Sequence, residues 1–192
     1  MAAQKFSILR HDSYKRMPWK NGGGETVEIA VSPEGAGLAD FDWRVSMATV
    51  ATDGPFSVFS SIDRTLSILE GAGMTLFIEG REPVLLTQES TPLPFAADAP
   101  TSATLVDGAI TDLNVMTRRG RLSHSVRRVR VDGSDELALG SETALVLCHR
   151  GHLDIGDRTL LAGDCLLVEE AAGTQHSISG MAQLFVIELH EV

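Results

Sequence analysis

Apolar and polar residues alternate with a period of two along most of the chain, and this is the pattern of half-buried β-strands. In the segment 26–31 the apolar positions are Val27, Ile29 and Val31, and the segment 41–48 alternates in the same way. Turns rich in Gly, Pro and Asp recur between such runs, and no long helical period appears. The sequence therefore predicts an all-β protein built from many short antiparallel strands.

A weak internal repeat indicates that this architecture occurs twice. Residues 66–86 contain an apolar run, a glycine turn and a second apolar run, and residues 144–161 show the same order. Two small barrels in one chain account for the repeat, although the loop lengths differ. The chain has 192 residues, of which 43% are hydrophobic, so it is long enough for one globular unit or two fused halves.

Charge and hydropathy exclude several classes of function. The formal net charge of −10 argues against nucleic-acid binding, which draws its affinity from clustered cations. No apolar stretch approaches the roughly 18 residues of a membrane helix, and the N-terminus has no apolar signal core, so we expect a cytoplasmic protein without a membrane partner. Cys148 and Cys165 have no metal-binding spacing and are expected to be small core residues.

One basic segment, residues 118–130, departs from the acidic average. It has two readings: a local patch for an anion or a protein partner, or a solvated connection whose charges offset nearby carboxylates. The second reading is favoured, because the segment lacks aromatic residues for stacking. Its cations are Arg118, Arg119, Arg121, Arg127, Arg128 and Arg130.

Three successive glycines, Gly22, Gly23 and Gly24, follow Trp19, Lys20 and Asn21 and lead into the first alternating run. Glycine loses more backbone freedom on folding than any other residue, so the triplet indicates positive φ angles or a close approach of the backbone to another group. A ligand pocket and a plain β-bulge both explain it.

Arg64 is the strongest candidate for a functional residue, because it shares strand parity with Leu66 and its side chain is therefore expected to point into the core. A buried guanidinium needs a carboxylate, supplied either by the protein or by a ligand. Arg44 and Ser46 share a face that either meets water or lines a polar interior, and Asn114 raises the same question. The alternation alone leaves these choices open.

Motifs for catalysis and metal binding are absent from the sequence. His149, His152 and His176 are the candidate metal ligands of the second half, but there is no His-x-His pair with a following Glu. No nucleophile elbow or phosphate loop occurs. We therefore expect no catalytic residue, metal or cofactor.

Four blocks of the chain together resemble the HutD/Ves family. They span most of residues 17–120, whereas the last third matches only in general cupin-like character. The blocks are Met17-Pro18-Trp19-Lys20-Asn21-Gly22-Gly23-Gly24, Phe41-Asp42-Trp43-Arg44-Val45-Ser46-Met47-Ala48, Asp53-Gly54-Pro55-Phe56-Ser57 with Ile62-Asp63-Arg64, and Thr111-Asp112-Leu113-Asn114-Val115-Met116.

The resemblance implies a double cupin (bicupin) fold with two antiparallel β-barrel halves, approximately residues 1–120 and 121–192. It also implies a link to histidine utilisation, in which family members sense or limit pathway flux and N-formylglutamate is a candidate ligand. No established catalytic activity comes with the family. Its Ves-like members are associated with stress responses.

Joined to the residue patterns, the resemblance gives the hypothesis of a non-enzymatic protein that binds a small anionic ligand, a carboxylate. Lys20, Arg44 and Arg64 would bind the carboxylate, and Asn21, Ser46 and Asn114 would supply neutral hydrogen bonds. Trp19 would form a wall of the site, and Gly22 and Gly23 would let the backbone approach the ligand. One alternative is a metal-dependent cupin enzyme, an isomerase or oxygenase that uses the three histidines above. Another is a stress-response interaction protein that uses the arginine segment. The oligomeric state stays open, with a homodimer as one arrangement, because exposed strands of such barrels can pair.

Overall fold

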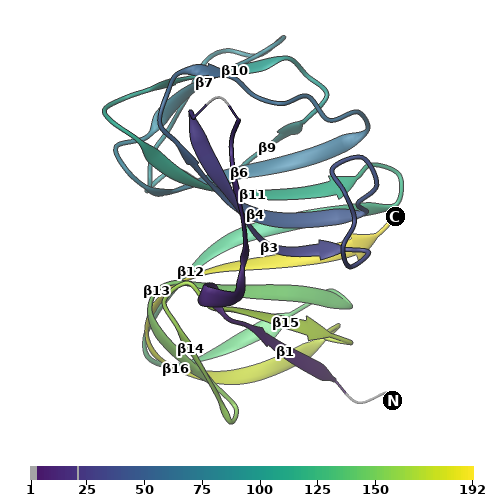
Figure 1. Ribbon diagram of the computed structural model, residues 1–192. Coiled ribbons are helices and arrows are strands. Elements are labelled where there is room, and N and C mark those ends of the chain that lie inside the picture. The colour runs from purple at the N-terminus through teal and green to yellow at the C-terminus, as the bar shows by residue number, and fades with distance from the viewer. Residues whose placement is uncertain (1–3, 21) are drawn as a thin grey trace. The chain divides into compact units, whose positions relative to one another are not determined.

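The computed structural model describes residues 4–20 and 22–192, and their regular elements are antiparallel strands and one short 3₁₀ helix, η1 (His11–Ser13) (Figure 1). The contacts divide the chain into two units. One is formed by residues 15–123, and the other by residues 1–14 together with residues 124–192. Among the described residues, no helix has the length and apolar character needed to span a membrane.

The unit of residues 15–123 contains two sheets. The larger has the order β2-β3-β4-β11-β6-β9, and the smaller has the order β5-β10-β7-β8. The strands of the larger sheet are β2 (Lys15–Pro18), β3 (Gly24–Ser32), β4 (Trp43–Val50), β11 (Ile110–Arg118), β6 (Ile62–Glu70) and β9 (Leu93–Ala96). Those of the smaller sheet are β5 (Gly54–Pro55), β10 (Thr101–Leu105), β7 (Met74–Ile78) and β8 (Val84–Leu86).

A single apolar cluster joins these two sheets. Leu66 and Ile68 of β6 pack in it with Met74 and Leu76 of β7, and all four side chains are fully buried. The alternation of β6 therefore places its even-numbered residues against the smaller sheet, as the period-two pattern predicts.

The other unit is one six-stranded sheet that contains three strands of 13 to 18 residues. Its order is β1-β15-β13-β16-β12, and β14 pairs with β13 off this path. The strands are β1 (Lys5–Leu9), β15 (Cys165–Glu169), β13 (Thr143–Ile155), β16 (Thr174–Glu191), β12 (Leu122–Leu139) and β14 (Arg158–Leu161). Cys148 and Cys165 are buried and form no disulfide, in agreement with the expected role of small core residues.

The all-β prediction is confirmed, with two differences. None of the three sheets closes on itself among the described residues, so the expected barrels are open. The units also differ from the expected halves, residues 1–120 and 121–192, in the first fourteen residues. These join the C-terminal part because β1 pairs with β15 from Lys5 opposite Glu169 to Leu9 opposite Cys165.

Candidate functional site

The candidate site is a set of polar side chains on the face of β4, β11 and β6 that packs against the smaller sheet. The strand pairing places these residues in rows that run across the three strands, and apolar residues of the cluster lie on the same face. The rows are Arg44, Met116 and Arg64; Ser46, Asn114 and Leu66; and Ala48, Asp112 and Ile68. Arg44, Ser46, Asn114 and Arg64, all expected from the sequence, thus lie on one buried face.

Arg44 has an internal partner. Its Nε donates a hydrogen bond to Oε2 of Glu28 on β3 over 2.7 Å, and its Nη1 lies 3.3 Å from Oγ of Ser46. The two charged side chains are only 6% and 13% exposed. The face that the sequence left open between water and a polar interior is therefore interior, and the charge of Arg44 is already neutralised there.

Arg64 has no such partner. Its side chain is buried, its Nε has no hydrogen-bond partner, and no carboxylate of the described residues lies within ion-pair distance. One terminal nitrogen lies 3.6 Å from Sδ of Met116. The guanidinium carbon lies over the rings of Phe56, Phe59 and Phe95, at 5.5, 5.3 and 5.8 Å from their centroids. These rings stabilise a cation but leave its hydrogen-bonding capacity unused.

Asp112 and Asn114 form a second polar pair on the same face. Asn114 Nδ2 donates to Oδ1 of Asp112 over 2.5 Å. Burial raises the pKa of the Asp112 carboxyl to about 7, against the opposing effects of the charge of Arg64 and of hydrogen bonds from Asn114 and Ala48. Burial also lowers the pKa of Arg64 to about 10, so Arg64 remains a cation at neutral pH. The site therefore contains a permanent cation and a carboxyl that titrates near neutrality.

The glycine triplet forms the hairpin between β2 and β3. The amide of Gly22, which has a φ of +71°, donates to the carbonyl of Trp19, and Trp19 Nε1 donates to Oγ1 of Thr26 over 2.8 Å. A Cβ on Gly24 would lie 2.0 Å from the carbonyl oxygen of Thr49. Tight packing and turn geometry thus explain these glycines without a ligand.

The remaining residues expected from the hairpin lie apart from the arginine rows. Trp19 is half-buried against the apolar cluster that underlies those rows. Lys20 is exposed, and Gly23 lies in the strand entry, where its carbonyl accepts from the amide of Ala51. Asn21 lies outside the described residues.

The three candidate metal ligands of the second unit are not brought together. His149 contacts the ring of Phe185, His176 contacts the ring of Phe6, and His152 is exposed. Within residues 4–20 and 22–192 there is no group of three His, Cys, Asp or Glu side chains arranged to hold a metal.

The arginine segment is largely engaged with the protein itself. Arg119 forms ion pairs with Asp63 and Asp98, at 2.7 and 3.0 Å, and Arg121 pairs with Asp42 at 2.7 Å. These contacts agree with the reading in which the charges offset nearby carboxylates.

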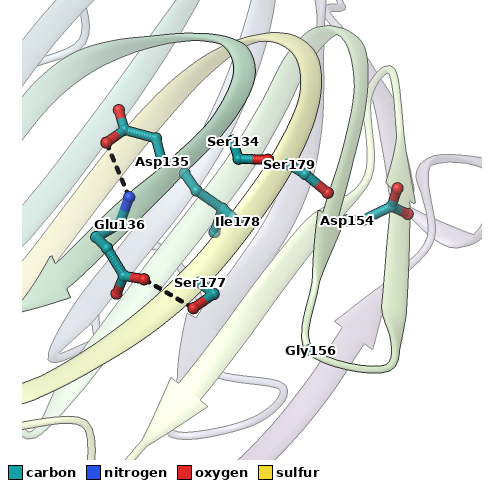
Figure 2. Close-up of a pocket in the computed structure, with 8 residues that line it drawn as sticks. All are labelled: Ser134, Asp135, Glu136, Asp154, Gly156, Ser177, Ile178 and Ser179. Carbon is teal, nitrogen blue, oxygen red and sulfur yellow. Dashed lines mark hydrogen bonds between the residues drawn. The ribbon is translucent and has the colours of Figure 1, made fainter.

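A separate cavity of about 490 Å³ lies in the unit that contains residues 124–192 (Figure 2). Its wall carries Asp135, Glu136 and Asp154 among serine hydroxyls, and Ser177 donates to Glu136 over 2.7 Å. An acidic wall repels carboxylates, so this cavity is not the site that the sequence predicts.

Sequence reasoning missed three parts of the site. Glu28 gave no local signal, whereas Asp112 shares strand parity with Asn114, two residues further along, and this parity was a usable signal. The phenylalanines around Arg64 come from β9 and from the segment after β5, and nothing local in the sequence brings those segments to β6.

Comparison with known proteins identifies the family. The HutD family model matches residues 11–186. The chain belongs to the HutD family. It is similar to protein Ves of Citrobacter koseri, with 34% identity over 94% of both chains. The structure of HutD from Pseudomonas fluorescens SBW25 is similar at a TM-score of 0.85 and 34% identity, over 98% of this chain and 100% of that one.

A more distant likeness concerns the fold alone. YhhW from Escherichia coli is 9% identical and aligns with a TM-score of 0.72 over 98% of this chain and 99% of that chain. Together with the HutD structure, it places this HutD-family protein among double cupin folds, as the sequence predicts.

Proposed function

We propose that this HutD-family protein is a non-enzymatic, cytoplasmic binder of a small carboxylate that acts as a sensor or regulator associated with histidine utilisation. The observation that carries the proposal is the guanidinium of Arg64, which is buried and charged and lacks a carboxylate partner among the described residues. A protein that needed only a packed core would be more stable with an apolar residue at this position. A ligand carboxylate supplies the missing partner.

The neighbouring groups suit a small, partly polar acid. Ser46 and Asn114 place a hydroxyl and an amide beside the two arginines in the register, and Phe56, Phe59 and Phe95 wall off water around Arg64. A hydrogen bond to a charged group contributes about 1.5–3 kcal/mol net. Two or three such bonds correspond to affinities from about millimolar to micromolar.

A similar structure guides the choice of acids. That structure is of HutD from Pseudomonas fluorescens SBW25 in a formate condition. For this chain we include formate and N-formylglutamate, with glutamate and urocanate as related acids. We expect at least one of them to bind at Arg64.

The test is a thermal-shift titration with each acid on metal-stripped protein, because a ligand selective for the native state raises the melting temperature. We expect a saturable shift that is lost in Arg64→Met and kept in Arg121→Met, which removes an exposed arginine. A shift that survives in folded Arg64→Met would place the ligand elsewhere. Stabilisation by a divalent metal, with no shift from any acid, would favour the metal-dependent enzyme instead.

A further inference from the structure

We propose that Asn114 is a specificity-determining residue of this site, and that it selects acids with an amide N–H beside the carboxylate, the class of N-acylated amino acids. This inference rests on the proposed function. It follows from the directions of the hydrogen bonds on the buried face, because these decide which atoms remain able to donate and which remain able to accept.

The contacts of Arg44 leave Ser46 as a donor. Nη1 of Arg44 donates to Oγ of Ser46 over 3.3 Å, and Nε of the same guanidinium is held by Glu28 at 2.7 Å. The hydroxyl of Ser46 thus accepts from the protein, and its own proton has no acceptor among the described residues. Ser46 therefore presents a proton to the buried face, which suits a carboxylate oxygen.

Asn114 presents the opposite polarity. Its Nδ2 donates to Oδ1 of Asp112 over 2.5 Å, and a carboxylate can only accept, so this contact fixes which end of the amide faces Asp112. Oδ1 of Asn114 is the other end, and it accepts no hydrogen bond from any residue that the structure describes. Asn114 is also the most exposed polar residue of the three rows, at 8%. Its carbonyl oxygen is thus available to a donor on a ligand.

The register places these groups within the span of one small molecule. Ser46 and Asn114 are direct partners on β4 and β11, so their Cβ atoms are roughly 5 Å apart. Asn114 pairs with Leu66 on β6, which makes Arg64 its diagonal neighbour at roughly 7–8 Å, a gap that long side chains bridge. The guanidinium of Arg64 indeed lies 3.6 Å from Sδ of Met116, two residues after Asn114. A carboxylate that accepts from Arg64 and Ser46 therefore lies beside the carbonyl oxygen of Asn114.

The donor that matches this oxygen is the N–H of a neutral amide rather than a free ammonium group. Both carboxylates of the face are engaged, Glu28 with Arg44 and Asp112 with Asn114, so an ammonium group would find only a neutral oxygen. The guanidinium groups of Arg44 and Arg64 on the same face would repel it. An acyl group removes the charge and keeps the donor, one carbon away from the carboxylate. A simple acid such as formate uses the contacts to Arg64 and Ser46 alone.

The experiment compares N-acetylglycine with its ester analogue acetoxyacetate, in which an oxygen replaces the N–H. Both are titrated calorimetrically into the full chain at pH 8, above the pKa of about 7 of Asp112, so that this carboxylate only accepts. We expect wild-type protein to bind N-acetylglycine at least about tenfold more tightly, because the ester sets one acceptor against another. Asn114→Leu should bring the ratio of the two affinities to about one, since it removes the carbonyl oxygen.

Ser46→Ala is the matched control on the same face. It removes the donor to the carboxylate, which the two acids share, so it should weaken both by about the same factor and keep their ratio. Asn114→Ser, which truncates the same amide, takes the place of Asn114→Leu if that variant does not fold.

The possible failures can be told apart. Saturable binding of both acids to wild-type protein with equal affinity would overturn the role of Asn114 and leave the proposed function standing. A ratio that persists in the folded Asn114 variant would overturn that role as well. No binding of either acid, nor of formate, would overturn both this inference and the proposed function.

Discussion

Arg44 and Arg64 are register partners of the same residue, Met116, on opposite sides of β11, yet of these two only Arg44 has an ion pair. Two buried guanidinium groups on one face thus differ in what surrounds them: Glu28 pairs with Arg44, whereas Arg64 lies over three phenylalanine rings. This difference makes each arginine the natural control for the other, because the same substitution should have opposite effects at the two positions.

Removing the unpaired cation should not harm the fold. Arg64→Met keeps much of the side-chain volume and removes a desolvated charge, and Asp112, whose ionised form the charge of Arg64 favours, can stay protonated in the variant. We expect the free energy of unfolding to stay within about 1 kcal/mol of wild type or to rise, measured by urea denaturation without ligand. A loss of several kcal/mol would identify Arg64 as a structural residue.

Removing the paired cation should be costly. Arg44→Met leaves Glu28 as an unpaired buried carboxylate, and we expect a loss of about 3–5 kcal/mol in the free energy of unfolding. Adding Glu28→Gln in the same chain should recover most of this loss. The double-mutant cycle measures the coupling, and independent effects of the two changes would mean that the 2.7 Å contact contributes little.

Asp112 should make stability fall as pH rises. Its pKa is about 7 in the folded protein and 3.8 as the ordinary value, so the folded state holds the extra proton between these limits. The contribution of Asp112 to the free energy of unfolding is fully present below about pH 4 and is lost as the pH rises to about 7. Asp112→Asn removes this dependence, so its unfolding free energy relative to wild type should rise on the order of 2 kcal/mol from pH 5 to 8.

The control for that series is Asp107→Asn, which should follow the wild-type pH dependence throughout. Chemical denaturation at matched ionic strength is the measurement. A constant difference between Asp112→Asn and wild type across the pH range would show that Asp112 has an ordinary pKa in the folded protein.

Strand alternation predicted the orientation of some site residues and not of others. Arg64 was placed with the core because β6 runs as a regular strand through Leu66 and Ile68. Arg44 and Ser46 stayed ambiguous because the large apolar residues of β4, Val45 and Met47, have the opposite parity, although both faces of the strand carry buried residues. Alternation does not reveal a buried face that polar side chains line.

The phenylalanines around Arg64 could not be predicted for a different reason. Phe56 and Phe59 follow β5, and Phe95 lies on β9 opposite Arg64. Their approach depends on pairings between segments distant in sequence. The same holds for β1, whose partner β15 lies some 160 residues further along the chain.

The glycines of the first hairpin should tolerate a methyl group very differently. Gly24→Ala puts a Cβ at 2.0 Å from the carbonyl oxygen of Thr49, so the backbone must move, and we expect a loss of about 3 kcal/mol or more. A Cβ on Gly22 would have no atom within 4 Å, so Gly22→Ala should lose only about 1 kcal/mol of unfolding free energy, from the strain of the positive φ. Thermal denaturation of both variants tests this order, and equal losses would contradict it.

The pairing of β1 with β15 has a consequence for synthesis on the ribosome. Every strand of the unit formed by residues 15–123 is complete before β15 is made, so that unit can fold while the chain is still growing. Strand β1 is made long before its partner, so residues 5–9 cannot form their native pairing until residues 165–169 leave the exit tunnel. The backbone groups of this strand therefore lack their native partners for most of translation.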